Sequence, residues 1–142
     1  MRDIFNNLDF KRGNSPIAAT TDNTAFVSQV LDMQGLSCAV LAILTGSLAD
    51  ADATFAVTAK ESDTGSFGGE ETVVAAADML GTLALASFIF SDDNKVFKLG
   101  FREGAKRYKQ VTITPANNSG NVFIAGLWVT APIMTPSDNP PT

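Results

Sequence analysis

The sequence has no histidine and only one cysteine, one tryptophan and one tyrosine among its 142 residues. The lack of histidine removes the commonest general base, every Ser-His-Asp or Cys-His arrangement and most zinc sites. The single cysteine, Cys38, excludes an intrachain disulfide framework. Because Cys38 lies in the apolar run LSCAVLAIL, we expect it to be a small buried hydrophobic residue. We therefore expect a non-enzymatic protein without catalytic residues, cofactor or metal.

Charged residues are also scarce, at 18% of the chain against about 25% in a typical globular domain, whereas hydrophobic residues make up 45%. A chain of this length forms one domain that buries roughly 68–70% of its unfolded surface. The first residues, MRDIFNNLDF, lack the basic and apolar regions of a secretory signal, and the apolar run at 36–44 is too short for a bilayer core of about 30 Å. These features predict a soluble protein made in the cytoplasm, with no membrane partner.

Short apolar or alternating segments, separated by turn signals, predict strands. The expected strands lie at 24–31, 36–44, 53–60, 83–90, 97–102, 111–114 and 121–131. The segments at 36–44 and 121–131 are apolar on both faces, which is typical of a central strand or of one covered by a neighbouring subunit. Segment 73–80 fits a helical turn or loop as well as an irregular edge strand, and both interpretations stay open.

Seven or eight short strands without a long amphipathic helix predict an all-β fold, an antiparallel, jelly-roll-like β-sandwich. We expect residues 1–16 to form an extended N-terminal arm that becomes ordered on a partner. Residues 17–131 are the predicted β-sandwich domain, and 132–142 a Pro-rich C-terminal tail. Within the domain, Glu103-Gly104-Ala105 is predicted to join the strands at 97–102 and 111–114 as a β-hairpin.

Two kinds of acidic motif were considered as possible sites. Asp63-Thr64-Gly65-Ser66 is similar to the active-site tetrapeptide of aspartic proteases, but it occurs once and follows polar residues, so we interpret it as an Asx-type turn. Asp50 with Asp52, and Asp92 with Asp93 and Asn94, offer oxygens to calcium without matching the twelve-residue loop spacing. We interpret these carboxylates as solvated turn residues.

Charge is distributed unevenly along the chain. Residues 45–94 contain nine acidic residues and one basic residue, whereas six of the ten basic residues fall within 95–109. The members of this basic strip are Lys95, Lys98, Arg102, Lys106, Arg107 and Lys109. The strip fits a solvated face, a surface docked on an acidic partner or second copy, or a phosphate-binding strip. The net charge of −5 and the near lack of aromatic residues other than Tyr108 on the polar side of the strip argue against nucleic acid.

Three short elements follow one another in a recognisable order. They are the Ala/Asp-rich segment 75–81 ending in Leu-Gly, the Gly-x-Lys-Arg-Tyr element at 104–108, and the strand Gly126-Leu127-Trp128-Val129 before the Pro-bearing end. Over about residues 24–135 the chain thus resembles the cement or decoration proteins of tailed-phage capsids. The resemblance implies a small β-sandwich on the outer capsid surface of the virion, the major capsid protein as partner, and synthesis in the host bacterial cytoplasm.

On this interpretation the arm and the basic strip are the expected contact surfaces, and we expect a homo-oligomer, either a dimer or a trimer. The arm residues concerned are Ile4, Phe5, Leu8 and Phe10. Two other classes stay open. A carbohydrate-binding β-sandwich module would need a row of exposed aromatic residues, for which Trp128 and Tyr108 are the only Trp and Tyr. A head–tail joining or tail component is also compatible with the sequence.

Overall fold

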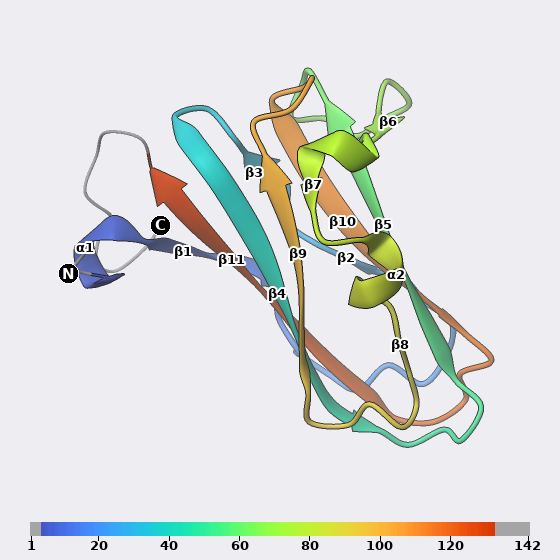
Figure 1. Ribbon diagram of the computed structural model, residues 1–142. Helices are drawn as coiled ribbons and strands as arrows, with labels where there is room; N and C mark the ends of the chain where they lie inside the picture. The colour runs from blue at the N-terminus through green and yellow to red at the C-terminus, as the bar shows by residue number, and fades with distance from the viewer. Residues whose placement is uncertain (1–3, 133–142) are drawn as a thin grey trace.

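The computed structural model describes residues 4–132, which form two antiparallel sheets packed face to face (Figure 1). The first sheet has five strands in the order β1 (Asp9–Asn14), β11 (Val122–Pro132), β4 (Leu36–Leu48), β9 (Val96–Arg102) and β7 (Met79–Leu80). The second contains β2 (Phe26–Val27), β10 (Tyr108–Ala116), β5 (Thr54–Ser62) and β6 (Thr72–Val73), with β3 (Leu31–Asp32) on β10 and β8 (Phe88–Ile89) on β5. The predicted antiparallel β-sandwich is confirmed.

The order of the strands follows a jelly-roll plan. The chain crosses from one sheet to the other at most of its connections, including those between β4 and β5, between β9 and β10, and between β10 and β11. When β2 with β3, and β6 with β8, are each counted as one position, β1-β11-β4-β9 faces β2-β10-β5-β6, as in a double-sheet jelly roll. The two strands predicted to be apolar on both faces, β4 and β11, are the central neighbours of the five-stranded sheet.

The core lies between the sheets and contains several large aromatic side chains. Trp128 is 1% exposed, its ring centroid lies 5.8 Å from that of Phe101, and its Nε1 donates to the Gln29 carbonyl at 3.2 Å. Phe88 stacks between Phe55 and Phe97, at 4.9 and 5.0 Å. Burying a side chain of this kind contributes about 1.5–3 kcal/mol relative to its exposure. This core holds the two sheets in one relative position.

The predicted N-terminal arm is wrong for its second half. Residues 9–14 form strand β1, which pairs with β11 in a register that sets Phe10 opposite Val129. A short helix, α1 (Ile4–Asn7), precedes it. Pairing with β1 satisfies backbone groups along one side of β11, which would otherwise form the sheet edge. The sandwich therefore begins before residue 17 and its last strand ends at Pro132; the rest of the predicted tail, 133–142, lies outside the described residues.

The predicted hairpin between the strands at 97–102 and 111–114 is also wrong. Strand β9 pairs with β4 and β7, whereas β10 pairs with β5, β2 and β3 in the opposite sheet. Residues 103–107 are thus a crossover between sheets. Alternation identifies the inward side chains correctly, such as Phe101 and Val111, both buried. Alternation does not show to which of the two sheets each strand belongs.

The segment predicted as a strand at 24–31 is interrupted at Ser28. The Ser28 hydroxyl accepts a hydrogen bond from the backbone N–H of Val111 at 3.0 Å, and the Ser28 N–H donates to the Val111 carbonyl at 2.8 Å. The side chain thus takes part in the hydrogen bonding along β10. Two short strands, β2 and β3, remain where one was expected.

The segments at 73–80 and 83–90 contain helical turns as well as strands. The first contains a 3-10 turn, η1 (Ala76–Asp78), followed by the edge strand β7. The helical-turn interpretation and the edge-strand interpretation are therefore each correct for part of this segment. The second begins as helix α2 (Leu83–Ala86) because the Thr82 hydroxyl accepts from the Leu85 N–H at 3.2 Å, an N-cap, and only then becomes β8. No helix within residues 4–132 is long and apolar enough to cross a bilayer.

Candidate functional site

Lys109, predicted to be a surface contact, lies in the core. Its side chain is 0% exposed and forms an ion pair with the Glu61 carboxylate, which is 4% exposed. The two residues are direct partners in the β10–β5 register. Lys109 is therefore unable to bind a partner, and the prediction for this residue is wrong. Strand β10 alternates, and position 109 shares the inward face with the buried Val111 and Ile113.

Three further members of the basic strip are held by acidic residues of the same chain. Arg107 binds Asp32 through two hydrogen bonds of 2.8 and 2.6 Å, which lower the pKa of the Asp32 carboxyl. The remaining pairs are Lys106 with Asp63 at 3.7 Å and Lys95 with Asp92 at 2.7 Å. These contacts connect loops and strand ends, so the strip is not one continuous surface.

Lys98 and Arg102 are different, because both project from the outer face of β9. In the antiparallel register Lys98 lies opposite Ala42, and Arg102 opposite Cys38. Side chains directly opposite each other in such a pair share one face of the sheet. Arg12 on β1 lies on this same face, since it pairs with Leu127, which in turn pairs with Ala42.

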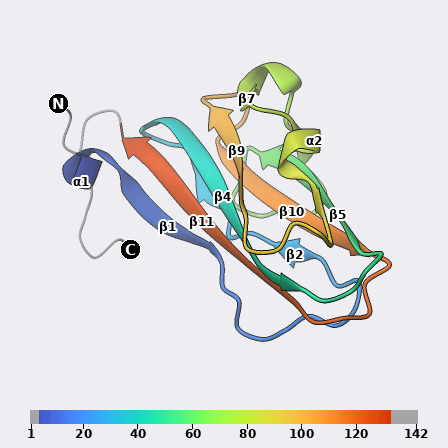
Figure 2. The same cartoon turned by 60° about the horizontal axis from the view of Figure 1, so that its bottom comes forward.

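Apart from these cations, the outer face of the five-stranded sheet is apolar. One row across the strands consists of Phe10, Val129, Val40, Gly100 and Leu80. The neighbouring rows carry Leu127 with Ala42, and Ala125 with Leu44 and Val96. Many of these side chains are exposed: Leu44 by 41%, Val96 by 67% and Phe10 by 38%. In Figures 1 and 2, no other helix or strand of residues 4–132 lies across β11 and β4 on this side.

Two hollows mark this apolar outer face. The larger, of about 460 Å³, lies between β9 and the β7–α2 segment and is lined by Val40, Leu80, Gly81, Leu85, Val96, Phe97, Lys98 and Gly100. A Cβ at position 100 would lie 2.8 Å from the Leu80 Cβ, so glycine there allows β7 to approach closely. The smaller, of about 210 Å³, lies beside Leu44 and Phe123. The face is therefore uneven as well as apolar.

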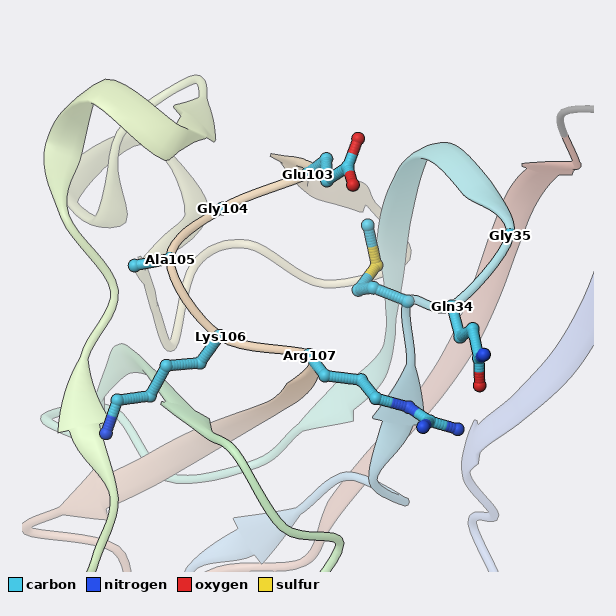
Figure 3. Close-up of a pocket in the computed structure, with 8 residues that line it drawn as sticks. Gln34, Gly35, Glu103, Gly104, Ala105, Lys106 and Arg107 are labelled. Carbon is cyan, nitrogen blue, oxygen red and sulfur yellow. The ribbon is translucent and has the colours of Figure 1, made fainter.

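A separate polar hollow of about 340 Å³ lies at one end of the sandwich, between the β3–β4 turn and the crossover at 103–107. In Figure 3 the side chains of Glu103, Lys106 and Arg107 point in different directions from this crossover. Lys106 and Arg107 are also engaged with Asp63 and Asp32. The charged groups therefore do not converge on one point where a small ligand would lie.

The acidic motifs are involved in local hydrogen bonds. Asp50 accepts from the N–H and the hydroxyl of Ser119, both at 2.6 Å, and these bonds lower the pKa of Asp50. A hydrogen bond with Asp50 raises the pKa of Asp52. Asp63 is exposed in its turn. Within residues 4–132 no group of three acidic, cysteine or histidine side chains is placed to hold a metal ion.

The four predicted contact residues of the arm differ from one another in exposure and position. Ile4 and Phe5 on α1 are exposed, by 67% and 65%, and Leu8 is partly buried. Phe10 belongs to the apolar outer face. The sequence analysis did not predict that these side chains form one exposed apolar face. The only indication of it was that the segments 36–44 and 121–131 are apolar on both of their faces. Which residues share a cross-strand row depends on the register of strand pairing, and this register is not evident from the sequence.

Comparison with known proteins gives little support for any function. No protein-family model matches the chain, and no curated protein matches it. Among solved structures, the chain is similar to a xylan-binding module, CBM15, with 14% identity over 92% of this chain and 94% of that one and a TM-score of 0.42. A similarity of that size carries no argument about ligands.

Proposed function

We propose that this protein is a decoration protein that binds the outer surface of a tailed-phage head and bridges neighbouring major capsid subunits. The observation that carries the proposal is the outer face of the five-stranded sheet, on which four neighbouring strands each expose an apolar side chain: Phe10 on β1, Leu127 on β11, Leu44 on β4 and Val96 on β9. Contiguous exposed apolar surface on a folded domain is typical of a protein–protein contact. The motif resemblance of segments 75–81 and 104–108 agrees with a capsid as partner.

The proposed activity is binding, and its effect follows from mass action. A protein that binds the assembled lattice but not separate subunits stabilises the lattice in proportion to its occupancy. Bridging two subunits at once strengthens attachment beyond that of either contact alone. An oligomer of this chain would add further contacts of the same kind.

Co-sedimentation of the purified protein with undecorated capsids, followed by counting copies per capsid, tests the proposal. We expect saturable binding at a fixed ratio to the major capsid subunit. Leu127→Glu, on the outer face, should abolish it, because a carboxylate would be buried in an apolar contact. Thr114→Glu, on the exposed face of the opposite sheet, is the matched control and should bind like the wild type. Equal binding by both variants would show that another surface attaches the protein.

The two rival functions predict other outcomes. A carbohydrate-binding module would bind in a glycan array, yet Trp128 is buried and the Arg107 guanidinium lies over the Tyr108 ring at 4.9 Å. A head–tail or tail component would leave capsids undecorated and co-purify with tails. Either result would replace the proposal.

A further inference from the structure

Ion pairing divides the basic residues of this chain into two groups. Nine of the ten lie within residues 4–132, since only Arg2 precedes them. Six have an acidic side chain within 4.0 Å; these are Lys11, Lys60, Lys95, Lys106, Arg107 and Lys109. The other three, Arg12, Lys98 and Arg102, have none within the described part of the chain. All three lie on the outer face of the five-stranded sheet.

The three cations have a defined spacing on that face. Arg12 and Lys98 end the same cross-strand row, with Leu127 and Ala42 between them, so about 14 Å separates their strands. Arg102 lies four residues from Lys98 along β9, or about 13 Å. Among the described residues that the register places on this face, none is acidic, although the whole chain carries a net charge of −5.

We infer that Arg12, Lys98 and Arg102 select the partner: the outer face docks on a protein surface with an apolar centre and carboxylates spaced to meet these three cations. The inference deepens the proposed function and rests on it. The hollow beside Leu80 and Gly100 receives an apolar side chain of that surface, with Lys98 at its rim. Complementary charges around an apolar contact raise the association rate and exclude wrong partners.

Two other occupants fit the face less well. A second copy docked through the same face would bring the cations of one molecule toward those of the other, and the described residues of that face include no acidic side chain to receive them. Nucleic acid would match the cations but would leave the apolar strip of Leu127, Val129 and Val40 against a phosphate backbone. An acidic, partly apolar protein surface satisfies both features.

The test compares two triple variants with the same net charge, −5 − 3 = −8. The first is Arg12→Gln, Lys98→Gln, Arg102→Gln; the control is Lys11→Gln, Lys60→Gln, Lys95→Gln, which removes three cations that have partners in the chain. Binding to undecorated capsids is measured between about 0.05 and 0.5 M NaCl. We expect the first variant to bind roughly tenfold more weakly at low salt, with a reduced salt dependence. The control should keep the wild-type salt dependence.

Each outcome has a definite meaning. Unchanged binding by the first variant, with wild-type protein bound to capsids, would overturn the selection by these cations and leave the decoration function standing. No capsid binding by wild type would overturn both. Equally strong, charge-dependent binding to duplex DNA, or self-association lost in the first variant, would also overturn the inference. If the triple variant does not fold, as judged by circular dichroism, Lys98→Gln and Arg102→Gln are measured separately on the same scale.

Discussion

Lys109 and Glu61 lie directly opposite each other on β10 and β5, and their side chains form an ion pair that is shut off from solvent inside the sandwich. The backbone of Gly104, in the crossover between sheets, lies close to the Lys109 ammonium: a Cβ at position 104 would be only 2.7 Å from Nζ. The pair thus lies where the crossover closes one end of the core. Because both side chains are buried, removing either one would leave the other as an unpaired charge inside the core.

Replacing Lys109 by methionine should destabilise the protein by about 3–5 kcal/mol, because Glu61 would remain buried without a countercharge. The double variant Lys109→Met, Glu61→Leu should recover most of that loss, since two apolar side chains of similar volume can occupy the site. Urea unfolding of the three proteins measures both effects. A single variant as stable as the wild type would show that the pair is not buried in solution.

The Arg107–Asp32 pair predicts a dependence of stability on pH. Hydrogen bonds from Arg107 lower the pKa of Asp32 in the folded protein. The pair therefore stabilises the fold above the unfolded-state pKa of about 3.9, and this contribution is lost as the pH falls through the lower folded-state value. Because both side chains are more than 40% exposed, the contribution is about 1 kcal/mol or less.

The measurement compares urea midpoints of wild type and Asp32→Asn between pH 7 and pH 2. Asp32→Asn should be the less stable protein at pH 7, and the difference should shrink below about pH 4. Glu71, whose pKa is lowered to about 2 by hydrogen bonds from its own backbone N–H, that of Gly69 and Lys60, titrates in both proteins. A difference that is constant over this pH range would contradict the prediction.

Gly13→Ala should weaken the attachment of β1. A Cβ at position 13 would lie 2.7 Å from the Gly126 carbonyl oxygen and 2.9 Å from the Leu41 side chain, so the edge strand would have to move. We expect a loss of about 1–3 kcal/mol, as for other overpacked positions. Gly68→Ala, where the nearest atom would be 3.6 Å away, should be nearly neutral. Thermal unfolding and amide exchange of residues 9–14 measure the effect; equal stability of the two variants would count against the β1 position.

Ser28→Ala should cost about 1–3 kcal/mol, because the buried N–H of Val111 would lose its hydrogen-bond acceptor. Ser28→Thr keeps a hydroxyl at this position and serves as the comparison. Chemical denaturation of both variants gives the difference. If alanine and threonine are equally stable, the Ser28 hydroxyl is not the acceptor.

The alternation of apolar residues predicted the β-sandwich and its inward side chains correctly. Phe55, Val57 and Ala59 face the core as their period of two requires. The same reasoning misplaced β9 and β10 in one hairpin, because a short connection with glycine is compatible with either a hairpin or a crossover. The same reasoning also missed β1. Its sequence, DFKRGN, is too polar to predict a strand, and the segment is extended because its backbone pairs with the edge of β11.

For the candidate site, the sequence by itself determined which kinds of residue are available: two segments that are apolar on both faces, six clustered cations and no histidine. Tertiary structure alone decided which cations are available. It buries Lys109 against Glu61, engages Arg107 with Asp32, and brings Arg12 from one end of the chain into the same row as Lys98. The physical reason is that the pairing of charges and the rows of a sheet depend on contacts between residues far apart in sequence, which local periodicity does not encode.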